Sequence, residues 1–204
     1  MLGAMRSKSL LLVMGLALIA PAARADSSFV SPPVLLTPPP SATPNLCQNR
    51  NQAFAQEAEV LIADGINEER AKFAPDAPPL MPDIDLTRIA QQRSCDMARG
   101  MSDFSHTDAE GNFIAADMVH RIFGPYGSVG ENIMELAGTV QFGRLPFSPE
   151  QFAREAVEGW MESPGHRKNI LNPRYDSSGI GVAMVGGQAL ATQVFRGPPR
   201  VRER

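Results

Sequence analysis

Apolar side chains recur at helical spacing along much of the chain. The first such stretch, 54–66, carries acidic residues between its apolar ones and predicts a helix that ends by Ala74, because prolines follow. A second helix begins after Asp83 or Asp85 as its cap and stops near Gly100. It places five apolar side chains on one face: Leu86, Ile89, Ala90, Met97 and Met101.

Two more helices are predicted further along. A short one covers 114–123 and is closed by Gly124, and another begins where Ser148 suits the N-cap and Pro149 the first helical position. The apolar residues of the latter fall on one face: Phe152, Ala156 and Trp160. The glycine-rich stretch 127–149 shows no period, so no element is assigned to it.

The C-terminal part has the pattern of a β-hairpin. Two runs typical of strands, 179–185 and 188–195, flank the pair Gly186-Gly187. Helices followed by a hairpin predict an α+β domain with an antiparallel sheet.

The N-terminal part has the features of a secretory signal peptide. Arg6 and Lys8 precede an apolar run at 10–20, and Ala23-Arg24-Ala25 fits a small-x-small cleavage site. The run is too short for a comfortable membrane span, so we expect a secreted or periplasmic protein with no membrane span after cleavage. The predicted divisions are a signal peptide at 1–25, a proline-rich linker at 26–46, a folded domain at 47–197 and a basic tail at 198–204.

The net charge bears on the class of partner, and the two cysteines bear on whether the fold contains a disulfide. The formal net charge is −3, and losing the three basic residues of the signal lowers it to −6, which argues against a nucleic-acid partner. Export places Cys47 and Cys95 in an oxidising compartment, and a disulfide between them would close a loop of about 48 residues. We expect this disulfide, because an unpaired thiol is a liability in an exported protein. The alternative leaves Cys95 as a small buried residue and Cys47 as a free thiol.

Candidate chemistry rests on few residues. Of the three histidines, His106 and His166 lie in turn-rich segments near acidic residues, whereas His120 falls in the short predicted helix. Two imidazoles with carboxylates could hold a divalent metal and leave coordination positions open. Spacing alone does not distinguish this from histidines with a purely structural role.

Several short motifs follow one another in a recognisable order. They are Ile66-Asn67-Glu68-Glu69-Arg70, Leu80 with Asp83 and Leu86, Phe104-Ser105-His106, Gly130-Glu131-Asn132-Ile133, the run from Trp160 to Leu171, and Tyr175 with Gly179-Ile180-Gly181. This order resembles the CAP superfamily (cysteine-rich secretory proteins, antigen 5 and pathogenesis-related proteins, or SCP domains), in its compact bacterial branch, over about residues 54 to 196. The resemblance implies a three-layer α-β-α sandwich with a central antiparallel sheet.

The resemblance also implies a cleft lined by four side chains: His106, Glu131, Glu155 and His166. Glu155 lies five residues before Trp160, as in the family, and Glu158 is the alternative for its place. The two histidines are the expected ligands of a divalent metal, with zinc as the candidate, beside a small or lipidic ligand.

Catalysis is not assigned to any residue, and a non-enzymatic module is favoured. One alternative is an extracytoplasmic hydrolase that uses the same cleft, with Ser105 or Ser163 as the residue to test. The other is a structural envelope or interaction module in which the four side chains only clamp the fold.

Overall fold

The computed structural model of the protein describes Cys47 and residues 52–125, 127–137 and 147–198. The expected signal peptide and linker lie outside the described residues, as does the basic tail beyond Pro198. In the part of the chain that is described, none of the helices combines the length and apolar character needed to cross a membrane.

A four-stranded sheet forms the centre, in the order β1-β3-β4-β2. Its strands are β1 (Met81–Pro82), β2 (Ser128–Ala137), β3 (Ser177–Val185) and β4 (Gln188–Gly197). The β3–β4 hairpin turns at two glycines with positive φ, as predicted, and β4 also pairs antiparallel with β2. The sheet is mixed rather than wholly antiparallel, because the two residues of β1 pair parallel to β3.

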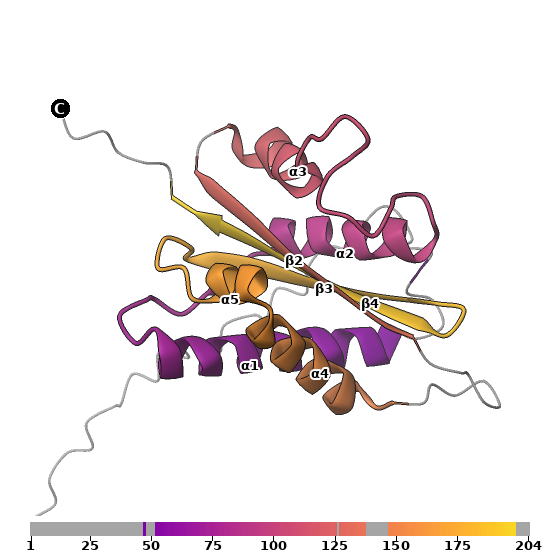
Figure 1. Ribbon diagram of the computed structural model, residues 1–204, viewed down its shortest axis with the longest axis horizontal. Coiled ribbons are helices and arrows are strands. Elements are labelled where there is room, and N and C mark those ends of the chain that lie inside the picture. Colours follow the sequence, from indigo (N-terminus) through magenta and orange to yellow (C-terminus); the bar gives the residue numbers. More distant parts are fainter. Residues whose placement is uncertain (1–46, 48–51, 126, 138–146, 199–204) are drawn as a thin grey trace, which may run out of the picture. The chain divides into compact units, whose positions relative to one another are not determined.

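Helices cover both faces of this sheet, which confirms the α+β sandwich (Figure 1). On one face lie α1 (Gln52–Phe73), α4 (Pro149–Glu162) and α5 (Pro164–Ile170), whose apolar side chains join those of β3 and β4 in the main core. On the other lie α2 (Ile84–Ala98) and α3 (Ile114–Phe123), packed through a second cluster that includes Leu86, Val119 and Val194.

The caps predicted for two helices are present. Oδ1 of Asp83 accepts the backbone N–H groups of Asp85 and Leu86, and Oγ of Ser148 accepts that of Gln151. One prediction for α2 was wrong: the helix ends at Ala98, so Met101 lies beyond its apolar face and is 66% exposed. Because the chain leaves the helix before Met101, this side chain no longer follows the helical spacing that would place it on the buried face.

The close approach of α2 to β3 depends on two glycines. A Cβ on Gly179 would lie 2.0 Å from the backbone N of Thr87, and one on Gly181 would lie 2.1 Å from that of Gln91. Oγ of Ser94, a fully buried side chain, donates to the carbonyl of Gly181 at 2.8 Å. The helix backbone therefore lies directly on the strand.

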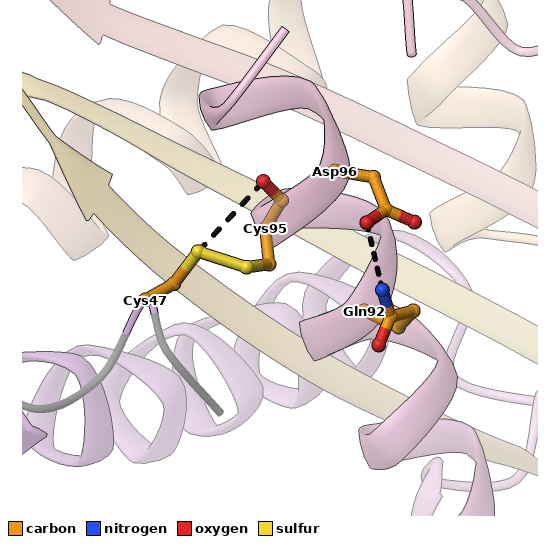
Figure 2. Close-up of a disulfide and its surroundings, with 4 residues drawn as sticks. All are labelled: Cys47, Gln92, Cys95 and Asp96. Carbon is orange, nitrogen blue, oxygen red and sulfur yellow. Dashed lines mark hydrogen bonds between the residues drawn. A yellow bond between two sulfur atoms is a disulfide. The ribbon is translucent and has the colours of Figure 1, made fainter. Parts of the chain in front are cut away.

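The predicted disulfide is present. Cys47 and Cys95 are bonded, with their Cα atoms 5.8 Å apart, and both are buried against Ala98 and Ala183. Figure 2 shows the bridge joining Cys47 to α2, close to Gln92, whose amide donates to the Asp96 carboxylate at 2.7 Å.

Candidate functional site

A buried ion pair lies between α2 and β2. Nε of Arg93 donates to Oε1 of Glu131 at 2.8 Å, and the two side chains are only 1% and 0% exposed. Glu131 lies on β2 opposite Val194, whose side chain packs against α2, so its carboxylate points to the α2 face of the sheet. A buried carboxylate of this kind needs such a partner, because an unpaired charge in a protein interior is costly.

The same carboxylate holds His106. This residue lies on the loop between α2 and α3, and its Nδ1 is 2.8 Å from Oε2 of Glu131. Its side chain is 42% exposed, in contrast to the fully buried carboxylate. The imidazole therefore lies at the surface with one nitrogen anchored inside.

His166 lies beside His106. Their ring centroids are 5.9 Å apart, with the rings inclined at 68°. The sequence predicted that His166 follows Pro164 on a turn, but Pro164 instead begins the short helix α5, and His166 is within it. Proline ends α4 and also suits the first position of a new helix, which the turn prediction overlooked.

Two asparagines connect α5 to β2. Asn132 donates to the carbonyl of His166 at 3.3 Å, and Asn169 donates to the backbone carbonyl of Glu131 at 3.1 Å and to Oδ1 of Asn132 at 3.0 Å. These bonds attach α5 to β2 through two side-chain amides. Arg167 lies instead over the ring of Phe73 at 4.5 Å.

Burial lowers the pKa of His166, and the nearby His106 lowers it further. Both effects disfavour the charged imidazolium. At neutral pH the ring of His166 is therefore a neutral base with a lone pair available to a ligand.

The fourth predicted residue is not joined to these three. Glu155 is exposed on α4 and makes no hydrogen bond or ion pair with another described residue. Its rival, Glu158, lines a groove between α1 and α4 with a volume of about 280 Å³, together with Gly65 and Val157. A place for Glu155 in the cleft stays a prediction.

The serines of the hydrolase alternative have other surroundings. Oγ of Ser105 accepts the backbone N–H of Thr107 at 3.1 Å, within its own turn. Ser163 separates α4 from α5. Within the described ranges, no hydrogen bond joins either hydroxyl to an imidazole.

Sequence reasoning missed Arg93. The spacing of α2 places it on the buried side of the helix, among Leu86, Ile89, Ala90 and Met97. A charged residue at such a position was the available signal, since it must find a partner there.

Among the described residues, no group of three or more His, Cys, Asp or Glu side chains is arranged to hold a metal ion, so any metal here would have two protein ligands at most from this set.

A comparison with known families identifies the chain. The sequence profile of the Cysteine-rich secretory protein family, CAP, matches residues 63–195. The protein belongs to the CAP family. The matched region of this CAP domain runs from α1 to β4 and includes His106, Glu131 and His166.

Relatives of this CAP domain include YkwD of Bacillus subtilis strain 168, which is 33% identical over 141 residues, 68% of this chain and 47% of YkwD. An extracellular SCP-domain protein from Bacillus anthracis superposes with a TM-score of 0.51 at 26% identity, over 76% of this chain and 44% of that one. An outer surface protein of Borrelia burgdorferi shares the fold, with a TM-score of 0.54 at 16% identity, over 70% of this chain and 93% of its own. The chain thus spans less than half of the length of the two Bacillus proteins.

Proposed function

We propose that this CAP domain is exported and binds a divalent metal ion, with zinc as the candidate, through His106 and His166. Export is supported by the predicted signal peptide, by the Cys47–Cys95 bridge, and by the extracellular description of the Bacillus anthracis relative. Metal binding rests on one observation: a histidine backed by a buried carboxylate faces a second histidine whose ring centroid is 5.9 Å away.

The donor set suits such an ion. Metal-binding imidazoles commonly donate their other ring N–H to a carboxylate, which orients the ring, and Glu131 stands in that relation to His106. Both oxygens of Glu131 are engaged by Arg93 or His106, so Glu131 orients a ligand rather than acting as one. With two imidazoles from the protein, a bound ion would have positions open to water or a further ligand and would act there as a Lewis acid.

The further ligand proposed is small or lipidic. Met101 and Phe104 precede His106 on the same loop and are 66% and 50% exposed. Exposed apolar side chains on the loop that carries a polar site suit an amphipathic ligand whose polar group approaches the histidines.

Calorimetric titration with zinc chloride tests the metal site. We expect stoichiometric binding by the wild type and weakened binding by His106→Ala and His166→Ala. His120→Ala is the matched control, because His120 lies on α3 and makes no hydrogen bond or ion pair with the cleft residues described here. Equal affinity in the wild type and the His106→Ala/His166→Ala double variant would overturn the proposal. The structural alternative predicts instead a lower melting temperature with no change in affinity.

A further inference from the structure

We infer that Arg93 is a positioning residue for His106: it holds the histidine at both the ring and the backbone, so that the Nε2 atom of His106 is the one presented to a ligand. The inference concerns the same site as the proposed function, and its metal-binding readout rests on that function. The tautomer of His106, measured by NMR, does not depend on metal binding and provides a separate readout.

Arg93 lies between the Glu131 carboxylate, which contacts the His106 ring, and the backbone that leads into His106. Besides its 2.8 Å bond to Glu131, its Nη2 donates to the carbonyl of Ser105, the residue before His106, at 2.6 Å. The same Nη2 lies 3.4 Å from Oε2 of Glu131, the oxygen that meets the ring, and Nη1 lies 3.5 Å from Oγ of Ser102. One guanidinium therefore ties the loop that carries His106 to the carboxylate that orients it.

These contacts fix which ring nitrogen is free. The ion pair with Arg93 makes Glu131 an acceptor, so the 2.8 Å contact with His106 requires Nδ1 to carry the proton. Nε2 then keeps its lone pair. Since Nδ1 is turned to a fully buried carboxylate while the side chain is 42% exposed, Nε2 lies on the accessible side of the ring.

Arginine is needed for this geometry. Its planar fork offers donors in fixed directions, which here reach a carboxylate and a backbone carbonyl at once. Lysine keeps the charge but concentrates its donors on one flexible ammonium, so it cannot hold both acceptors in the same arrangement.

The chain offers a control in Arg70, which is also 1% exposed and is the other such arginine in the described part of the chain. Arg70 donates to the backbone carbonyls of Pro78, Ile170, Asn172 and Tyr175 and, among the described residues, to no carboxylate. We expect Arg70→Lys to destabilise the fold without touching Glu131 or the carbonyl of Ser105, the two groups through which Arg93 holds His106.

The test is nitrogen NMR of protein with labelled histidine at about pH 8, well above the ordinary histidine pKa of about 6.5. We expect His106 in the wild type to be the Nδ1–H tautomer alone, and in Arg93→Lys to be a mixture of the two tautomers. Arg70→Lys should keep the wild-type pattern while lowering the melting temperature. A pure Nδ1–H tautomer in Arg93→Lys would overturn the inference, as would a tautomer mixture in the wild type.

If Arg93→Lys does not fold, two neutral pairs avoid a lone buried charge: Arg93→Gln/Glu131→Gln, which keeps a side-chain donor at position 93, and Arg93→Met/Glu131→Gln, which does not. Loss of a single His106 tautomer in the methionine pair but not in the glutamine pair supports the role of the donor at position 93, and identical spectra contradict it. Zinc affinity is the second readout: we expect a roughly 10- to 100-fold loss in Arg93→Lys, a range typical of residues that orient metal ligands. Arg70→Lys is a control for the NMR spectra alone, because Arg70 also donates to the carbonyl of Ile170 at the end of α5, the helix that carries His166. A wild type that binds no zinc would reject the proposed function and leave the NMR result to decide this inference.

Discussion

The backbone N–H of Val182 donates to Oε1 of Glu59 at 2.9 Å, although 123 positions separate the two residues. Glu59 lies on α1, whereas Val182 lies on β3, beyond the two residues that pair with β1. Gln91 of α2 donates to the same carboxyl group at 3.3 Å. Glu59 therefore satisfies an N–H at the open edge of β3, in a site enclosed by helices from both faces of the sheet.

This burial makes stability depend on pH. Desolvation raises the pKa of Glu59 from 4.5 to about 7, against the opposing effects of the Val182 and Gln91 bonds. The folded protein thus holds a proton that the unfolded chain releases, and stability falls as pH rises from about 4.5 to about 7. At about 1.4 kcal/mol per pH unit, the free energy of unfolding falls by about 3.5 kcal/mol at most, and by less because the group is partly exposed.

Glu59→Gln is expected to remove this part of the pH dependence. Glutamine keeps an acceptor for Val182 and carries no charge at any pH, so the variant should gain stability over the wild type as pH rises. Urea unfolding at a series of pH values measures the difference, and Glu57→Gln, an exposed position on the same helix, is the control. Parallel curves for wild type and Glu59→Gln would contradict the prediction.

Removing the disulfide should lower stability by about 4 kcal/mol, because a loop spanning 48 positions is no longer closed in the unfolded chain. The variant to use is Cys47→Ala/Cys95→Ala, since both cysteines are buried among alanines and alanine adds no polar group there. Guanidinium unfolding of the wild type with and without reductant should reproduce the loss. The same comparison on the variant should show no effect of reductant.

Gly181→Ala should be strongly destabilising, by about 3 kcal/mol, because its new Cβ would lie about 2 Å from the backbone of α2. Gly159→Ala on α4 is the matched control. Its Cβ would meet nothing within 4 Å, and alanine favours the helix by about 0.5–1 kcal/mol. Thermal unfolding of the two variants should shift in opposite directions, and similar shifts would show that the contact of α2 with β3 is not rigid.

Arg70→Met is expected to lower the free energy of unfolding by at least about 3 kcal/mol. It removes the donors from buried carbonyl oxygens that include those of Pro78 and Tyr175, and unsatisfied buried acceptors are costly. Arg88→Met is the comparison. Among the described residues, Arg88 forms only an exposed pair with Asp85 at 2.9 Å, so its loss should lower the free energy of unfolding by less than about 1 kcal/mol. A similar free energy of unfolding for both variants, measured in urea, would contradict a structural role for Arg70.

Several elements followed from local chemistry alone. Prolines and caps set the limits of α1, α2 and α4, the two positive-φ glycines set the hairpin, and the export signal favoured the pairing of Cys47 with Cys95. These features depend on residues close in sequence or, for the cysteines, on a count that allows only one partner.

The strand β2 could not be predicted in the same way. Its residues 130–133 are all buried, including a glutamate and an asparagine, so the alternation that marks a half-exposed strand is missing. Gly130 adds to the difficulty: glycine is uncommon in strands, yet a Cβ there would lie 2.6 Å from the hydroxyl of Tyr175.

By itself, the sequence determined the order of most elements, the family, and the two histidines and the glutamate that the structure brings together. Only the tertiary structure decided that Arg93 lies between Glu131 and the backbone before His106, and that Arg70 and Glu59 bond to distant main chain. The physical reason is that a helix spacing fixes which way a charged side chain points, whereas its partner comes from another segment and is set only when the layers pack.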